Sequence, residues 1–547
     1  EKYFGSWKKS ETLSAPQYGP QPKFTQPVDT TVVGLEAETV YLGWRADKGN
    51  SLQCDTLNII SELLSNNRAG LFDLDLNQTM KVQSAGAGFS ELTDYSMFIA
   101  MGIPKKGQTL QEVRDLLLAE IEKLKKGDFS DDLLPSVINN YKRSYYTSLD
   151  NNKFRAKAFV DAFINNVDWK QEVDKLNRIS KMTKAEIVSF ANRFFDNGYA
   201  AVYKVQGTDT TIQKVDKPKI TPIPTNNDKH SAFLQEIVNH QVEPIKPVFV
   251  DFKKDLTKST TKKGWPILYK QNTQDDLFTL YLEIPFGKES DLLPGYAKMY
   301  IDYLGTDKMT NAQIKQELYK LACDYDIGQT DDETYFKLTG LNENLPKALA
   351  LINDVIDNAK VDKEAYAAAV DLLIKSQKDK KADQKSNFRA LQDYGMYGAY
   401  NSTRNILSEE QLKNMDPQKL LNSLKGLKNY KQTVLYYGPS SLKDIDNLLS
   451  KTFKTAKKFT LLPKEKRYTL QTTPKNEILI APYDAKNIYM VQFHNENKEW
   501  NPNDAAKIAV FNEYFGGGMN AIVFQEMREA RALAYSASAS YRTPSRL

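Results

Sequence analysis

The stretch Thr93-Asp-Tyr-Ser-Met-Phe-Ile-Ala-Met-Gly-Ile103 is rich in strand-forming residues and ends directly before Pro104. A helical pattern follows, because Thr109 and Glu112 have the spacing of a capping box. Apolar residues then recur at helical spacing until Gly127, a residue type that commonly ends helices. We therefore expect a strand followed by a capped amphipathic helix.

The same order of elements returns later in the chain. Residues 277–284 predict a strand, Thr310 and Gln313 open a helix with a second capping box, and residues 335–341 predict another strand. Strand pairs that alternate with helices are typical of α+β domains. We expect such domains to be repeated, each an antiparallel sheet with helices packed on one face.

Length and charge narrow the function classes. A chain of 547 residues and 62.3 kDa exceeds what one hydrophobic core usually supports, so we expect about two to four domains. The net charge of +5 is a small difference between 74 basic and 69 acidic residues, which argues against nucleic-acid binding. No apolar run approaches the ~20 residues of a membrane span.

The chain also predicts an internal repeat. Three short segments resemble later ones: the helix end at Phe4 resembles that at Phe453, the strand around Tyr41 resembles a strand around Tyr489, and the helix end at Phe72 resembles that at Phe524, at offsets of 449, 448 and 452. Nearly constant offsets indicate a duplication of about 450 residues. We therefore expect residues 21–215 and the region from 471 onward to share one fold, with the second copy truncated at Leu547.

Few residues are suited to binding a metal. The chain has three histidines, His230, His240 and His494, and no H-x-x-E-H or H-E-x-x-H pair. Its cysteines, Cys54 and Cys323, are far apart and predict packed thiols rather than a disulfide or ligand cluster. Nucleophile-elbow and phosphate-loop motifs are absent as well. The sequence thus predicts no metal ligands in this chain.

The segment Tyr514-Phe-Gly-Gly-Gly-Met-Asn-Ala-Ile-Val-Phe-Gln-Glu-Met-Arg-Glu-Ala-Arg-Ala-Leu-Ala-Tyr535-Ser carries a specific pattern. It resembles the glycine-rich stretch, helix and R-E-x-x-x-L-A-Y-S signature of the pitrilysin/insulinase family of zinc metallopeptidases, the inverzincins. We take the resemblance to span the chain. It would run from the tail of the first family domain, through the second and third, into the start of the fourth.

The resemblance implies specific roles for several residues. In this family an H-x-x-E-H helix and a downstream Glu of the first domain hold zinc, so the cofactor of the parent protein would be zinc with ligands outside this chain. Arg528 and Tyr535 match an Arg and a Tyr that contact substrate backbone and the oxyanion. Preorganised donors of this kind are worth roughly 3–4 kcal/mol each. Gly516, Gly517 and Gly518 would contact substrate, although a simple helix end explains them equally well.

Other parts of the chain that resemble functional sites of the family lack the functional residues. The first copy of the repeat has Leu76 and Gln83 where the second has Arg528 and Tyr535, so only the second copy carries the two donors. In the third domain a helix resembles the family's metal helix, but its H-x-x-E-H positions hold three residues that are unsuited to zinc. These residues are Tyr296, Met299 and Tyr300.

The resemblance also divides the chain into metallohydrolase-like parts. We expect a tail of a preceding domain over residues 1–20, a second domain over 21–213, a Pro- and Lys-rich linker over 214–263 with a short helix near 232–240, a third domain over 264–470 and a truncated fourth over 471–547.

The sequence is compatible with two functions. The first is a zinc metalloendopeptidase that cleaves peptides or small unfolded proteins in a closed chamber, with this part supplying substrate contacts. The alternative is a non-catalytic peptide-binding or assembly scaffold. The expected partners are a peptide substrate and the missing first domain, without nucleic acid or a membrane span in this chain. The sequence does not define the compartment; of the alternatives, we expect a periplasmic or other extracytoplasmic one.

Overall fold

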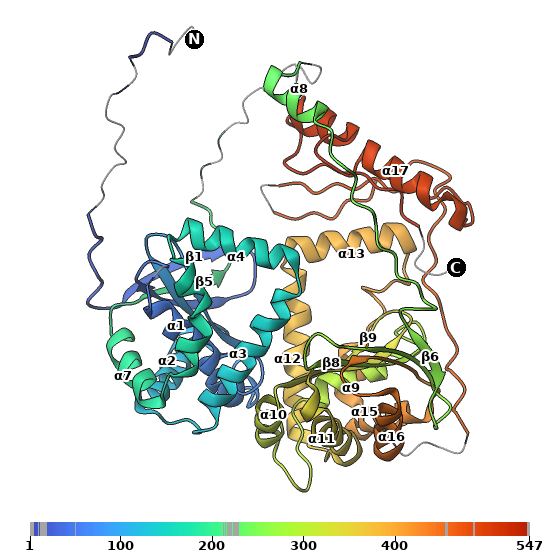
Figure 1. Cartoon of the computed structure of the whole chain (residues 1–547), viewed down its shortest axis with the longest axis horizontal. Coiled ribbons are helices and arrows are strands. Elements are labelled where there is room, and N and C mark those ends of the chain that lie inside the picture. Colours follow the sequence, from blue (N-terminus) through green and yellow to red (C-terminus); the bar gives the residue numbers. More distant parts are fainter. Residues whose placement is uncertain are drawn as a thin grey trace. The chain divides into compact units, whose positions relative to one another are not determined.

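The computed structural model describes residues 5–8, 10, 19–49, 51–211, 213, 215, 221, 229–453, 458–484 and 487–543 (Figure 1). Two compact units are distinguished by their internal contacts. Unit 1 contains Glu1–Thr208, Lys258–Asp383 and Leu407–Glu465, and unit 2 contains Asp209–Thr257, Gln384–Ile406 and Lys466–Leu547. Among the described residues, no helix is long and apolar enough to cross a lipid bilayer.

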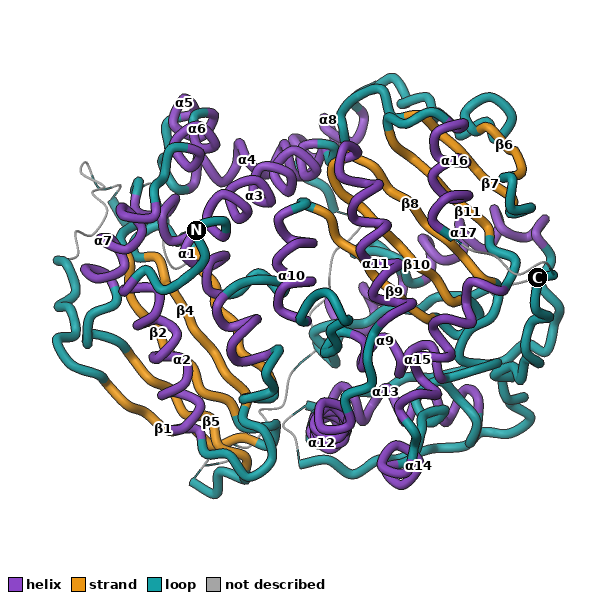
Figure 2. Tube along the Cα trace, turned by 90° about the horizontal axis from the view of Figure 1, so that it is seen from below, coloured by secondary structure: helices purple, strands orange, loops and turns teal. Residues whose placement is uncertain are grey.

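Five strands form the first sheet of unit 1, in the order β1 (Val28–Gly34), β5 (Ala200–Gln206), β2 (Thr39–Ala46), β4 (Ser96–Ile103) and β3 (Ser84–Ser90). Its domain also contains α1 (Gln53–Leu64), the π-helix η1 (Asp73–Asn77), α2 (Leu110–Lys126), α3 (Leu133–Leu149), α4 (Asn152–Ile164), α5 (Trp169–Val173), α6 (Lys175–Ser180) and α7 (Lys184–Phe194). Helix α2 packs on β2 and β4 and covers one face of the sheet (Figure 2).

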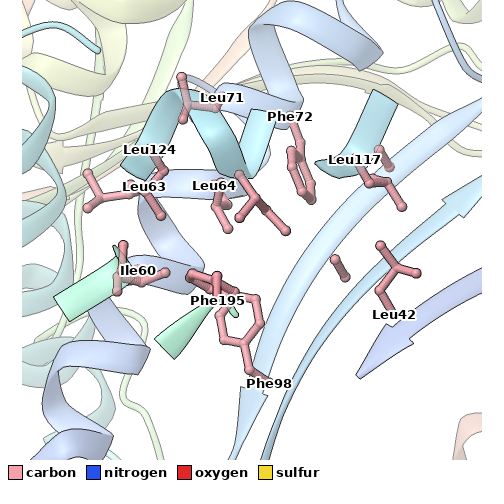
Figure 3. Close-up of a cluster of buried hydrophobic side chains, with 14 of the residues drawn as sticks. Leu42, Ile60, Leu63, Leu64, Leu71, Phe72, Phe98, Leu117, Leu124 and Phe195 are labelled. Carbon is pink, nitrogen blue, oxygen red and sulfur yellow. The ribbon is translucent and has the colours of Figure 1, made fainter. Parts of the chain in front are cut away.

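Local sequence accounts for these elements. Burial alternates along β2, so that Leu42 points to the helix-covered face while Tyr41 is 40% exposed on the other. Thr109 caps α2, with the predicted reciprocal bond from Glu112, and Gly127 ends the helix at a φ of +70°. The apolar stripe of α2 is buried in the core of the domain (Figure 3). The sequence-based prediction for this stretch is confirmed.

Six strands form the second sheet, in the order β6 (Thr257–Thr260), β7 (Pro266–Gln271), β11 (Thr433–Gly438), β8 (Leu277–Ile284), β10 (Thr334–Leu341) and β9 (Cys323–Gln329). Its domain contains α9 (Leu293–Ile301), α10 (Asn311–Lys320), η2 (Asn342–Asn344), α11 (Leu345–Asn358), α12 (Lys363–Lys381), α14 (Glu409–Asn414), α15 (Pro417–Gly426), η3 (Leu427–Asn429) and α16 (Leu442–Thr452). Helix α11 packs on β10 (Figure 2).

The two sheets share one topology. Strand order β1-β5-β2-β4-β3 in the first sheet matches β7-β11-β8-β10-β9 in the second. Within each matching set of five strands, the last strand in the sequence inserts beside the first and pairs with it in parallel, whereas the other registered pairs are antiparallel. The predicted α+β class with repeated domains is therefore confirmed, but the sheets are mixed rather than purely antiparallel.

Unit 2 contains α8 (Ala232–Asn239), α13 (Gln384–Tyr397), η4 (Pro502–Asp504), α17 (Ala505–Phe515) and the π-helix η5 (Phe524–Glu529). Helix α8 confirms the short helix that the sequence predicts within the linker. The strand predicted around Tyr489 is wrong, since residues 487–501 have no strand. Instead the Gln384 amide donates to the Asn487 carbonyl at 2.7 Å, and the Tyr489 ring lies 5.4 Å from that of Phe388.

The missing strand has a physical explanation. In the first copy, β2 is hydrogen-bonded to β4 on one side and to β5 on the other. Around Tyr489, by contrast, the described residues belong to neither sheet. A segment without a neighbouring strand must satisfy its backbone polar groups in other ways. Here the Gln384 side chain of α13 donates to the backbone carbonyl of Asn487. The proposed pairing of Phe4 with Phe453 lies partly outside the described residues, because Phe4 is not among them.

Within unit 1, the domain of the second sheet contributes a residue to the hydrophobic core of the domain of the first sheet. Tyr319 of α10 is 6% exposed and belongs to the hydrophobic cluster of the first domain. The buried Asn140 amide of α3 donates to the Tyr319 carbonyl at 2.8 Å. Nearby, Arg143 donates to the Ala322 carbonyl at 3.0 Å and forms an ion pair with Asp324. The contact therefore combines an inserted aromatic ring with charge-assisted hydrogen bonds.

A buried carboxyl in the first domain predicts a pH-dependent stability. Glu120 on α2 is 3% exposed and shares Lys123 with Asp75 of η1, at N–O distances of 3.0 and 2.7 Å. Burial, with the nearby Asp75 charge, raises the pKa of Glu120, although Lys123 opposes the shift. Because the folded pKa lies above the unfolded one, the stabilising contribution is complete at low pH and is lost as pH rises through the folded pKa.

We expect Glu120→Gln to raise the melting temperature at pH 7, because the amide has the same shape and carries no charge to desolvate. The difference from the unmutated protein should shrink as pH falls toward 4, where Glu120 is itself protonated. Melting curves across this pH range measure it. Glu122→Gln, on the exposed side of the same helix, is the control and should change little. A stabilisation by Glu120→Gln that does not depend on pH would contradict this explanation.

Candidate functional site

The glycine triplet ends helix α17 in unit 2. Gly516 is the C-cap, and its N–H donates to the Asn512 carbonyl at 3.0 Å. A Cβ at Gly516 would lie 2.2 Å from the carbonyl oxygen of Ala539, whose own N–H donates to Gly516 at 3.4 Å. A Cβ at Gly518 would have no neighbouring atom within 4 Å. Gly516 therefore allows a close backbone approach, and Gly518 faces open space.

Alanine substitutions at Gly516 and Gly518 can distinguish a structural role of a glycine from contact with substrate. Gly516→Ala should lower the melting temperature, because one of two backbone segments must move to admit the methyl group. Gly518→Ala should leave the melting temperature nearly unchanged. If Gly518 contacts substrate, Gly518→Ala should still raise the KM for peptide when the chain is assayed together with the domain that the resemblance expects to hold zinc. Equal melting temperatures for the two variants would contradict the observed packing of Gly516 on Ala539.

A π-helix positions Arg528. This residue lies on η5, and a left-handed residue, Ala532 with φ of +48°, follows the helix. The Ala532 N–H donates to the Arg528 carbonyl at 3.0 Å, and the Leu533 N–H donates to the Met527 carbonyl at 2.9 Å. These bonds reverse the chain, so that Tyr535 returns toward η5. π-Helices are rare and are frequent at functional sites.

The structure brings the two predicted catalytic residues together. The Arg528 guanidinium carbon lies 5.0 Å from the centre of the Tyr535 ring and 4.6 Å from that of Phe524. Its Nε is 3.5 Å from a carboxylate oxygen of Glu529. Tyr535 is 88% exposed and the Arg528 side chain 35%, so both are accessible to a ligand. The sequence did not indicate the Phe524 contact, although the spacing of four residues is compatible with it.

The first copy of the repeat has the same local backbone without the donors. Its π-helix η1 is also followed by a left-handed residue, Met80 with φ of +51°. Leu76, at the position of Arg528, is fully buried, and the Gln83 amide donates to Asp379 at 3.2 Å. In both copies a π-helix is thus followed by a residue with left-handed φ. The second copy carries an accessible Arg–Tyr pair beside it.

Helix α9, in the domain of the second sheet, does not offer a zinc site. The Tyr300 hydroxyl donates to the Asp362 carbonyl at 2.8 Å and accepts from its N–H at 2.9 Å. The Tyr296 hydroxyl accepts from the Leu407 N–H at 3.0 Å. Both hydroxyls therefore hold neighbouring backbone, and Met299 between them is a poor zinc ligand. The residues at the metal-helix positions of α9 do not fit zinc.

Side chains elsewhere in the described part of the chain form no metal-binding cluster. No group of three or more His, Cys, Asp or Glu side chains is placed there to hold an ion. The His494 Nδ1 lies 3.0 Å from the Thr473 hydroxyl, while His230 and His240 flank the exposed helix α8. The buried thiols of Cys54 and Cys323 are unpaired with each other, and burial raises the pKa of Cys54.

Two family models match this chain. The model of the peptidase M16 inactive domain matches residues 1–141 and 429–546, and the model of insulinase (peptidase family M16) matches residues 267–404. The chain belongs to the pitrilysin/insulinase family of zinc metallopeptidases, peptidase family M16, and carries its inactive domain.

Relatives in this family include proteases from bacteria and fungi. The chain is 27% identical over 203 residues to zinc protease PqqE from Helicobacter pylori, a match that covers 36% of this chain and 45% of that protein. It is 22% identical over 128 residues to the mitochondrial-processing peptidase subunit beta from Neurospora crassa, covering 22% and 27%. The matches thus span less than half the length of these two relatives.

Two solved structures of proteases resemble this chain at lower sequence identity than these two relatives. The ferredoxin protease FusC aligns with a TM-score of 0.42 at 9% identity, over 86% of this chain and 55% of that one. The periplasmic protease PqqL from Escherichia coli aligns with a TM-score of 0.35 at 12% identity, over 84% and 55%.

Proposed function

We propose that this chain is the non-metal-binding part of a zinc metalloendopeptidase that cleaves peptides or small unfolded proteins inside a closed chamber. In this proposal it supplies substrate- and oxyanion-contacting residues, and a separate domain supplies the zinc ligands. The observation that carries the proposal is the pairing of Arg528 and Tyr535, whose guanidinium carbon and ring centre are 5.0 Å apart on an accessible surface.

The two side chains suit different tasks. The phenol of Tyr535 is a single O–H donor at the end of an exposed ring, which suits one developing oxyanion. The guanidinium of Arg528 has five N–H donors in a fixed fork, so its contact with Glu529 does not exhaust it. It can hold substrate backbone carbonyls while Tyr535 donates to the reacting centre. We also propose that the chain divides into domains at residues 20, 213, 263 and 470, as the family resemblance implies.

The chain alone should hold no stoichiometric zinc and hydrolyse no peptide, because the positions of its degenerate metal helix are Tyr296, Met299 and Tyr300. Metal analysis after zinc addition to metal-free protein and a quenched fluorescent peptide measure both. Activity should appear when the domain with the H-x-x-E-H helix is supplied, and Arg528→Ala should weaken it.

One tightly held zinc per chain would contradict the assignment of the metal site to a separate domain. Unaltered hydrolysis by a folded Arg528→Ala variant would contradict the proposed substrate contact. Peptide binding without hydrolysis, even with the H-x-x-E-H domain present, would favour the scaffold function instead.

A further inference from the structure

The guanidinium of Arg528 contacts two aromatic rings rather than one. Its carbon is 4.6 Å from the centre of the Phe524 ring and 5.0 Å from that of Tyr535. Phe524 begins η5 and lies four residues before Arg528, so the ring and the cation share one side of the π-helix. The contact with Phe524 exists within the helix itself, whereas the contact with Tyr535 depends on the chain reversal after it.

A ring face and a guanidinium at this distance attract each other. The attraction is electrostatic, because the ring face carries partial negative charge, and it reaches the guanidinium from within about 6 Å. Phe524 is half-buried and Arg528 is 35% exposed, so the pair sits at the edge of solvent. A long side chain there would otherwise sample many rotamers. The Phe524 ring therefore restricts where the guanidinium can lie.

The first copy of the repeat supports this role. Phe72 and Leu76, four residues apart beside and within η1, are both fully buried in the core of the first domain. In the second copy the aromatic residue is kept as Phe524, and the aliphatic partner is replaced by Arg528. A ring that packs an apolar side chain in one copy thus faces a cation in the other.

We infer that Phe524 is a positioning residue that holds the Arg528 guanidinium beside Tyr535 before substrate arrives. This inference rests on the proposed function of the Arg–Tyr pair. Phe524 need not touch the reacting atoms, and its effect on the reaction would pass through Arg528 alone. A competing explanation is that Phe524 only packs against η5. In that case, replacing Phe524 would lower kcat/KM whichever residue is at position 528.

Kinetics of the zinc-containing enzyme assembled with this chain separate the two explanations. Phe524→Leu keeps an apolar side chain but removes the ring, and it should lower kcat/KM about two- to five-fold, mainly through KM. Phe524→Trp keeps a ring face and should restore the value. In an Arg528→Ala background, Phe524→Leu should have no further effect. An equal, additive loss in that background would overturn the positioning role.

An NMR measurement on the chain itself tests the contact without activity. In protein labelled at arginine, the Arg528 Nε–H resonance should move when Phe524→Leu removes the ring current, and Phe524→Trp should preserve a ring-shifted resonance. An unchanged Arg528 resonance in Phe524→Leu would overturn the inference. If Arg528→Ala proves fully active while the resonance moves as expected, the proposed function fails and the ring contact stands.

Discussion

If the proposed zinc metalloendopeptidase function is correct, replacing Tyr535 by Phe in that enzyme should lower kcat and kcat/KM together by about 10²–10³. The substitution removes one hydroxyl and keeps the ring that lies 5.0 Å from the Arg528 guanidinium. Because Tyr535 is 88% exposed, the lost hydroxyl leaves no buried cavity and should not change the fold. A parallel fall in both constants is expected when a donor acts on charge that exists only in the transition state.

Arg528→Ala provides the matched comparison for this measurement. If the guanidinium holds substrate carbonyls in both the ground and transition states, KM should rise more than kcat falls. Steady-state kinetics on a quenched peptide give both constants, zinc content should stay constant, and melting curves identify misfolded variants. A folded Tyr535→Phe variant with full activity would make Tyr535 a packing residue and remove the oxyanion contact.

Phe72→Ala should destabilise the first domain by about 3–5 kcal/mol, the usual cost of truncating a buried aromatic residue. Phe72 is fully buried beside Leu64 and Leu117 in the core that Figure 3 shows. It also directly precedes η1, so the cavity would form where the π-helix meets the core. We expect lower melting temperature and lower urea midpoint, since packing there is dense and relaxes only partly.

Phe159→Ala is the control for this change. Phe159 lies on α4, is 59% exposed and stacks on Trp169 at 4.3 Å between ring centres. Its truncation loses that ring pair but creates no cavity, so the expected cost is below about 1.5 kcal/mol. Equal free energies of unfolding for the two variants would show that Phe72 is not part of a tightly packed core.

Local signals in the sequence predicted much of the fold. The capping boxes of α2 and α10 and the left-handed Gly127 depend on residues three or four positions apart, which the sequence alone displays. Strand β8 was predicted with its observed bounds because its apolar pattern follows Asp275 and Asp276 and ends before Pro285. The strand at Tyr489 was predicted wrongly, since a strand also requires partners distant in the sequence.

Less of the candidate site could be predicted from local pattern. Arg528 and Tyr535 were selected from a family signature, and the reversal that brings them together depends on the π-helix η5 and on Ala532. A π-helix needs one extra residue in a turn, for which no simple spacing rule exists. The contact of Phe524 with Arg528 depends on side-chain direction along η5, so it became evident only in the structure.

The insertion of Tyr319 has a consequence for folding. Its ring completes the core of the first domain although it belongs to the second, and Arg143 binds Asp324 across the same boundary. Neither domain can bury its apolar surface fully by itself, so their unfolding should be cooperative despite the roughly fifty residues between their sheets. Cleavage within residues 229–257 would cut the covalent connection and leave two fragments that remain associated as one thermodynamic unit.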